Sequence, residues 1–143
     1  MKVLLAVALG ALALSGGPPH VVARSVDGGQ VAELRLPPSG RFALEYLHSY
    51  YREPARETFR ARDDGSFELV AVSSPSEAVL DYYEIDGKRS SRNGVWTLRP
   101  AHPPRFDGMA LAATAVGRRT LVASGRRAPL YGGDVHLRIE VER

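Results

Sequence analysis

Residues 42–59 read FALEYLHSYYREPARETF, and this stretch decides the fold. Phe42, Leu44 and Tyr46 alternate with small or charged residues, which is the period-two pattern of a β-strand with one buried face. A polar crossing then separates this strand from a second one, which contains Glu57 and Phe59. The order predicts two antiparallel strands that form a β-hairpin.

The same alternation recurs along the chain, and turn residues such as Asn93-Gly94 separate the segments. We predict strands at 20–25, 32–36, 42–48, 55–62, 67–72, 80–85, 95–99, 111–116, 120–124 and 135–141. A single helical turn is predicted at 74–78, with Pro75 at its first position. The pattern predicts an all-β domain, either an antiparallel β-sandwich or a partly open barrel, of about eight to ten short strands.

Composition limits the class of protein. The 143 residues fit one domain, and 44% of them are hydrophobic, which is enough for a packed core. With 19 Lys and Arg against 16 Asp and Glu, the net charge of +3 is too small for a nucleic-acid-binding surface. The sequence has no cysteine, so disulfides and thiolate metal sites are excluded, and no motif predicts a cofactor.

The first residues have the pattern of an export signal. Met1-Lys2 is followed by the uncharged apolar run VLLAVALGALAL at 3–14 and by small residues around Ser15. We interpret 1–15 as a signal peptide, 16–19 as a flexible linker and 20–143 as a single β domain. The run is shorter than the ~20 residues of a membrane-spanning helix, and an uncleaved anchor through 3–14 is the alternative. The predicted location is periplasmic or otherwise extracytoplasmic.

The predicted hairpin brings polar and aromatic side chains to one end. We predict a register that sets Tyr46 opposite Phe59. Two residues nearer the crossing, the same register pairs His48 with Glu57, and both pairs share one face of the sheet. A slip of one residue would bury Glu45 instead.

Two interpretations of this pair stay open. In the functional one, His48 is a base or ligand donor that Glu57 orients, because a carboxylate beside an imidazole fixes its tautomer. In the structural one, the pair pins a long loop. Ser49 faces away from His48 on a regular strand, so no catalytic dyad is expected, and the chain lacks the G-x-S-x-G motif. The four histidines share no short ligand spacing, so no metal site is predicted.

Two other groups also carry alternative interpretations. Arg118, Arg119, Arg126 and Arg127 flank the strand at 120–124. They form either a basic edge for an anionic partner or solvated strand ends that discourage edge pairing. The tyrosine pairs at 50–51 and 82–83 either line a binding mouth or contribute one core and one exposed ring each.

The quoted stretch is similar to a known family. The residues that carry the likeness are Phe42, Tyr46, His48-Ser49, Pro54 and Glu57-Thr58-Phe59, which resemble the hallmark of the bacterial domain of unknown function family 1850. The resemblance spans roughly 21–142 and departs at 74–83, where many members have a glycine-rich segment. Members are small exported or membrane-anchored proteins, often encoded beside tripartite ATP-independent periplasmic transporters of the TAXI type. The resemblance implies an accessory role at such a transporter and assigns no catalytic residue.

These observations leave three functions to separate. The first is a non-enzymatic accessory or interaction protein of a membrane solute transporter. The second is an extracytoplasmic protein that binds a small ligand or lipid at a mouth near Tyr46, His48, Tyr50, Tyr51 and Glu57, with Ser49 a further candidate at the same place. The third is a hydrolase or isomerase that uses His48 and Glu57. A polar and aromatic pocket at the hairpin mouth would favour the second, and a fully packed interior there would exclude it.

Overall fold

A computed structural model describes residues 16–143, and the predicted signal segment 1–15 lies outside the described residues. The described chain contains twelve strands and one short helix. They are β1 (His20–Ser25), β2 (Gln30–Arg35), β3 (Arg41–Leu47), β4 (Pro54–Ala61), β5 (Phe67–Ser74), α1 (Glu77–Asp81), β6 (Gly87–Arg92), β7 (Val95–Pro100), β8 (Arg105–Phe106), β9 (Met109–Ala112), β10 (Thr120–Ala123), β11 (Arg126–Pro129) and β12 (His136–Glu142).

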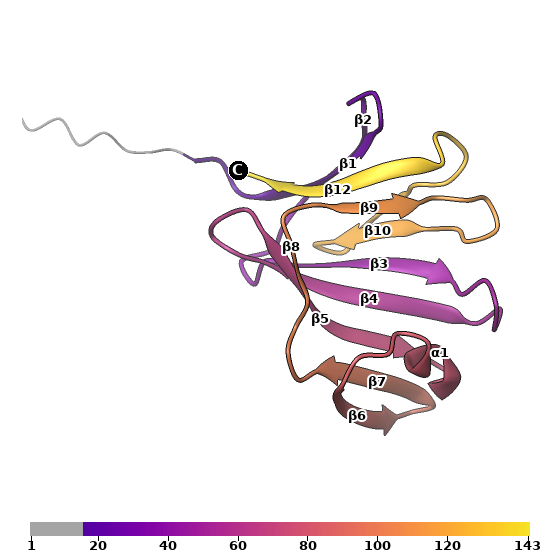
Figure 1. Ribbon diagram of the computed structural model, residues 1–143. Coiled ribbons are helices and arrows are strands. Elements are labelled where there is room, and N and C mark those ends of the chain that lie inside the picture. Colours follow the sequence, from indigo (N-terminus) through magenta and orange to yellow (C-terminus); the bar gives the residue numbers. More distant parts are fainter. Residues whose placement is uncertain (1–15) are drawn as a thin grey trace, which may run out of the picture.

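The strands form two antiparallel sheets (Figure 1). The smaller sheet has the order β2-β1-β12-β9, and the larger one has the order β11-β10-β3-β4-β5-β7-β6, with β8 paired to β5. The predicted all-β antiparallel fold is confirmed. The described chain has more strands than predicted because short segments such as β8 also pair.

The hydrophobic core lies between the two sheets. Phe42 and Phe59 are opposite each other on β3 and β4, and their rings stack with centroids 5.2 Å apart. Leu121 of β10 and Ile139 of β12 are fully buried in the same cluster. Because this cluster combines residues of both sheets, the packing is that of a β-sandwich.

Two predicted strands are wrong in whole or in part. Residues 80–85 do not form a strand, because α1 covers the first of them and turn hydrogen bonds from Tyr83 to Leu80 and from Glu84 to Asp81 follow. The strand expected at 111–116 ends at Ala112. The apolar residues that suggested a strand belong to the end of helix α1, where Leu80 is buried.

Helix α1 also starts later than predicted. Its N-cap is Ser76, so Pro75 precedes the helix instead of occupying its first position. The hydroxyl of Ser74 accepts the Ser76 backbone N–H at 3.1 Å, which fixes this bend. Val79 and Leu80 anchor the helix in a second buried cluster with Ala55 and Leu98.

The β3–β4 hairpin is confirmed, but its predicted register is wrong. Tyr46 lies opposite Ala55, and Phe59 lies opposite Phe42. The offset from the predicted register is an even number of residues, so the same side chains still face the core. The connection is shorter than predicted because His48 closes it through its own backbone, donating to the Glu53 carbonyl at 2.8 Å.

The proline-rich segment after β7 leads the chain from one sheet to the other. It runs through β8, which still belongs to the larger sheet, to β9 of the smaller sheet. Among residues 16–143, no helix has the length and apolar character needed to cross a membrane.

Candidate functional site

A cavity of about 550 Å³ opens where the ends of β3 and β9 and the turn after α1 meet. These three segments lie together at the right of Figure 1. A backbone hydrogen bond of 2.8 Å from Leu47 to the Gly117 carbonyl ties β3 to the segment that follows β9. We call this space the hairpin-mouth cavity. Its lining residues are Tyr46, Leu47, His48, Ser49, Glu57, Tyr82, Tyr83, Ala112, Thr114, Gly117 and Arg119.

All four residues that the sequence nominated at the hairpin mouth line this cavity: Tyr46, His48, Ser49 and Glu57. Ser49 does so because β3 ends at Leu47, so the two-faced geometry of a regular strand does not extend to it. The predicted His48–Glu57 pair does not form, since the hydrogen-bond partner of the Glu57 carboxylate is the Tyr83 hydroxyl.

His48 is held by the loop and by aromatic rings. Its side chain is buried, and its Nδ1 accepts the backbone N–H of Tyr51 at 3.3 Å. The rings of Tyr82 and Tyr51 lie 4.7 and 5.2 Å from the imidazole, measured between centroids. In the neutral imidazole this arrangement leaves the ring proton on Nε2.

The Nε2 side of His48 faces open space. Within residues 16–143 this nitrogen makes no side-chain hydrogen bond, and no polar side-chain atom there is both buried and unpaired. Because His48 lines the hairpin-mouth cavity, its Nε2–H is a hydrogen-bond donor available to whatever occupies that cavity.

Glu57 is a carboxylate on the core-facing side of the sheet. Its strand neighbours are Leu44 on β3 and Val72 on β5, and both are fully buried. The Tyr83 hydroxyl donates to Glu57 Oε1 at 2.6 Å. Burial raises the pKa of Glu57, and the Tyr83 hydrogen bond and the positive charge of Arg119 oppose this rise.

The two inner tyrosines form a relay that ends at Glu57. The single proton of the Tyr83 hydroxyl goes to Glu57, so the hydrogen bond between the hydroxyls of Tyr46 and Tyr83 has Tyr46 as its donor. Burial raises the pKa of both phenols, and the nearby Glu57 carboxylate raises them further. The tyrosines therefore remain neutral donors and position the carboxylate.

Arg119 supplies the positive charge of the cavity. Its guanidinium lies over the Tyr46 ring, with Cζ 4.6 Å from the centroid. Its Nε donates to the Ala112 carbonyl at 3.0 Å, which fixes the plane of the group. The terminal guanidinium nitrogens have no carboxylate within 4.0 Å among residues 16–143.

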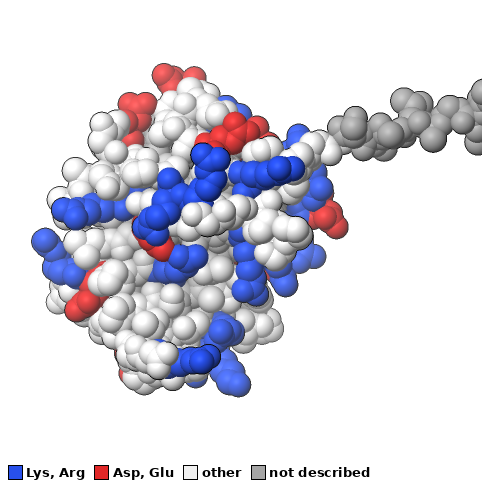
Figure 2. All heavy atoms as spheres, turned by 180° about the vertical axis from the view of Figure 1, so that it is seen from behind, with Lys and Arg blue, Asp and Glu red and all other residues white. Residues whose placement is uncertain are grey.

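The predicted basic edge is divided between two surfaces. Arg119 turns into the cavity, whereas Arg127 binds Glu45 at 2.5 Å on the outer face of the larger sheet. Glu45 is also bound there by Arg56. Figure 2 shows basic side chains spread across one face of the molecule, with acidic side chains among them. The four arginines are thus not brought together as one anion site.

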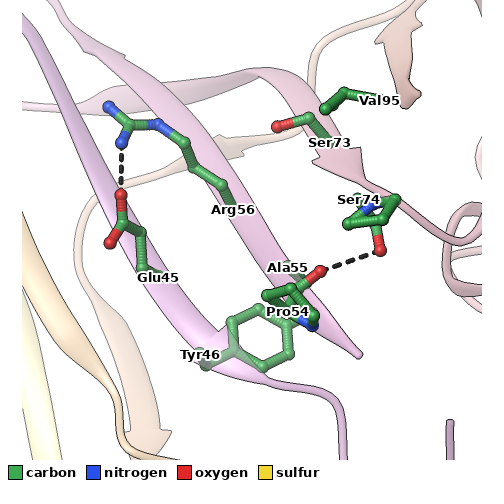
Figure 3. A pocket seen from close by; sticks show the side chains of 9 residues that line it. Glu45, Tyr46, Pro54, Ala55, Arg56, Ser73, Ser74 and Val95 are labelled. Atoms are coloured by element: carbon green, nitrogen blue, oxygen red, sulfur yellow. Dashed lines mark hydrogen bonds and ion pairs between the residues drawn. The ribbon is translucent and has the colours of Figure 1, made fainter. Parts of the chain in front are cut away.

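A second hollow, of about 310 Å³, is also lined by Tyr46 (Figure 3). Two pairs of its polar groups are already bonded within the chain. Arg56 pairs with Glu45 at 2.5 Å, and the Ser74 hydroxyl donates to the Pro54 carbonyl at 2.8 Å. The hairpin-mouth cavity, with free donors on Arg119 and His48, is the better candidate for a ligand site.

The sequence indicated some of this site and missed some of it. The tyrosine pair at 82–83 was predicted to line a mouth or to divide between core and surface, and it does both: Tyr83 is half-buried and Tyr82 is 66% exposed. The contact of Tyr83 with Glu57 gave no sequence signal, since the two are 26 residues apart. Among residues 16–143, no group of three acidic or histidine side chains has the geometry of a metal site.

Comparisons with known proteins add nothing to this geometry: no protein-family model, curated protein or solved structure matches the chain. Membership of family 1850 stays a prediction from the residues at 42–59.

Proposed function

We propose that this chain is an extracytoplasmic protein that binds a small polar organic molecule in the hairpin-mouth cavity. The observation that carries the proposal is the convergence of unpaired polar groups on one cavity of about 550 Å³. That volume lies within the ~300–1,000 Å³ of small-ligand sites, which combine apolar and aromatic walls with a few placed polar groups. Tyr46, Tyr82 and Tyr83 provide the aromatic walls.

The placement of Glu57 supports this function over a purely structural one. A carboxylate between Leu44 and Val72 is costly to bury, and an apolar residue at this position would stabilise the sandwich more. Costly polar groups of this kind are characteristic of functional sites.

An enzyme is supported less well. The hydrolase or isomerase interpretation depended on Glu57 orienting His48, and Glu57 is instead bound by Tyr83. His48 Nδ1 is occupied by the loop backbone. We therefore propose binding without turnover.

A transporter accessory is the second candidate. Four of the residues that carry the resemblance to family 1850 also line the cavity: Tyr46, His48, Ser49 and Glu57. In this proposal the protein presents or senses a solute beside a tripartite transporter. Mild crosslinking in the native host, followed by identification of captured proteins, tests it; failure to recover any transporter subunit would remove its support.

The cavity itself is tested by a pair of variants on β9. Ala112 lines the cavity and Ala110 does not, and both side chains are exposed two residues apart on one strand. Ala112→Trp is expected to fill the mouth, whereas Ala110→Trp adds the same ring outside it. Thermal unfolding is measured with a panel of amino acids, hydroxy acids, sugars and polyamines.

At least one compound class should stabilise wild type and Ala110→Trp, by about 2.7 kcal/mol at a hundredfold excess over Kd. The same compound should not change the stability of Ala112→Trp. The proposal fails when no class stabilises wild type, or when Ala112→Trp responds as strongly as wild type.

A further inference from the structure

The hairpin-mouth cavity carries one positive and one negative group that do not pair with each other. Arg119 and Glu57 both line it. None of the ion pairs within 4.0 Å among residues 16–143 includes either side chain. Two opposite charges that face one space without touching leave room for a ligand between them.

We infer that the ligand is a small zwitterion that carries an ammonium group and a carboxylate. This inference rests on the proposed function and specifies the chemistry of the same site. Arg119 binds the ligand carboxylate, and Glu57 binds the ammonium.

Arg119 is oriented for a carboxylate. Its Nε is committed to the Ala112 carbonyl and its plane lies over the Tyr46 ring, so the terminal nitrogens are the donors that remain. A fixed guanidinium presents these donors as a fork that matches the two oxygens of a carboxylate. The Nε2–H of His48 is a further donor to an anionic or polar oxygen.

Glu57 and the tyrosines suit a cation. Tyr83 holds one carboxylate oxygen at 2.6 Å, which leaves the other oxygen for the ligand. The exposed ring of Tyr82 lies at the same cavity, and aromatic faces attract ammonium groups. Burial raises the pKa of Glu57 in the free protein, and a bound cation would supply the charge partner that this carboxylate lacks.

Ligands with a single charge fit less well. A simple anion would meet Arg119 but also the Glu57 carboxylate, and a simple cation would meet Glu57 but also Arg119. A neutral molecule would displace water from both charged groups and leave each without a partner, which costs free energy.

The test compares ligands that differ by one charge. Three compound sets are titrated calorimetrically: L-alanine, L-alaninamide and L-lactate; L-phenylalanine, L-phenylalaninamide and L-phenyllactate; and 4-aminobutyrate, 4-aminobutyramide and 4-hydroxybutyrate. The third set has a longer separation between its charges. In at least one set the zwitterion should bind tenfold or more tightly than both relatives.

Three variants then assign each charge. Glu57→Gln should abolish the preference for the amino acid over the hydroxy acid and keep the preference over the amide. Arg119→Gln should do the reverse, and Arg119→Lys should retain part of the preference over the amide because it keeps the charge. Thermal unfolding of each free variant verifies that it is folded.

The inference is overturned when no zwitterion of the three sets binds, or when a relative with one charge binds as tightly as its zwitterion. It is also overturned when Glu57→Gln and Arg119→Gln weaken all three members of a set equally. These results leave the proposed function standing if another compound class still distinguishes Ala112→Trp from Ala110→Trp, so the two failures are distinguishable.

Discussion

Glu57 shows most clearly how a single residue departs from the pattern of the fold. Its position on β4 faces the core, where an apolar side chain would stabilise the protein. Tyr83 donates to it, and Tyr46 donates to Tyr83, so the carboxylate is placed by two other elements. Such an arrangement trades stability for a fixed acceptor in a cavity.

Glu57→Gln should therefore stabilise the free protein at neutral pH. The pKa of Glu57 is raised above its ordinary value of 4.5 in the folded state, so the folded protein holds this proton more tightly than the unfolded chain does. Well below pH 4.5 this carboxyl is protonated in both the folded and the unfolded state. The wild type and the variant should then have equal unfolding free energies. As the pH rises through the folded-state pKa, the wild type loses stability and the variant does not.

Urea unfolding of both proteins at pH values from 4 to 8 measures this difference. The other cavity groups facing Glu57, namely Tyr46, Tyr83, Arg119 and His48, are the same in both proteins, so the difference isolates the carboxylate. A variant that is less stable than wild type at pH 7 would contradict the account.

At this scale the sequence indicated the right side chains and the wrong partner. Tyr46, His48, Ser49 and Glu57 do line one cavity. Their contacts depend on the turn after α1, and no local pattern relates Tyr83 to a residue 26 positions away.

At the scale of elements, the alternation predicted most strands but not the exact pairing. An even change of register keeps every core-facing residue on the core side, so hydrophobic pattern alone does not distinguish the two registers of β3 and β4. The observed register also pairs Pro54 and Ala55 with β3. Strands β6 and β11 were missed because their side chains are mostly exposed and show no apolar alternation.

The β6–β7 hairpin depends on close backbone contact at Gly87. A Cβ atom there would lie 2.9 Å from the Pro100 Cα and closer still to the Arg99 carbonyl. Gly87→Ala should separate the strands and cost about 1–3 kcal/mol, as other overpacked substitutions do. Gly133→Ala is the control, because a Cβ there meets nothing within 4 Å. Equal unfolding free energies for the two variants would refute this contact.

At the scale of the whole molecule, the two sheets share one hydrophobic core, in which phenylalanine rings of the larger sheet pack with side chains of the smaller sheet such as Ile139. Phe59 stacks on Phe42 and meets Phe67 edge to face, and it is 1% exposed. Phe59→Ala should cost about 3–5 kcal/mol of unfolding free energy. Tyr50→Ala is the control: the Tyr50 ring is 76% exposed, so its loss should change the unfolding free energy little. Denaturant unfolding distinguishes them, and a small effect at Phe59 would contradict a core shared by both sheets.

The fold class was predictable because burial of one face imposes period two on the sequence of strands such as β3 and β12. The hairpin-mouth cavity at the end of the sandwich was not predictable, because it is built from four separate parts of the chain. Its two opposite charges, Arg119 and Glu57, come from a loop and a strand that only the sandwich brings together.

The most direct test of the ligand site is an NMR titration of the ¹⁵N-labelled protein with the tightest binder of the panel. Saturable shifts are expected at the amides of Leu47, His48, Ser49 and Gly117 and at the Arg119 Nε–H. Shifts confined to Ser73, Ser74 and Val95, which line the hollow of Figure 3, would contradict this expectation, as would a spectrum that no panel compound changes.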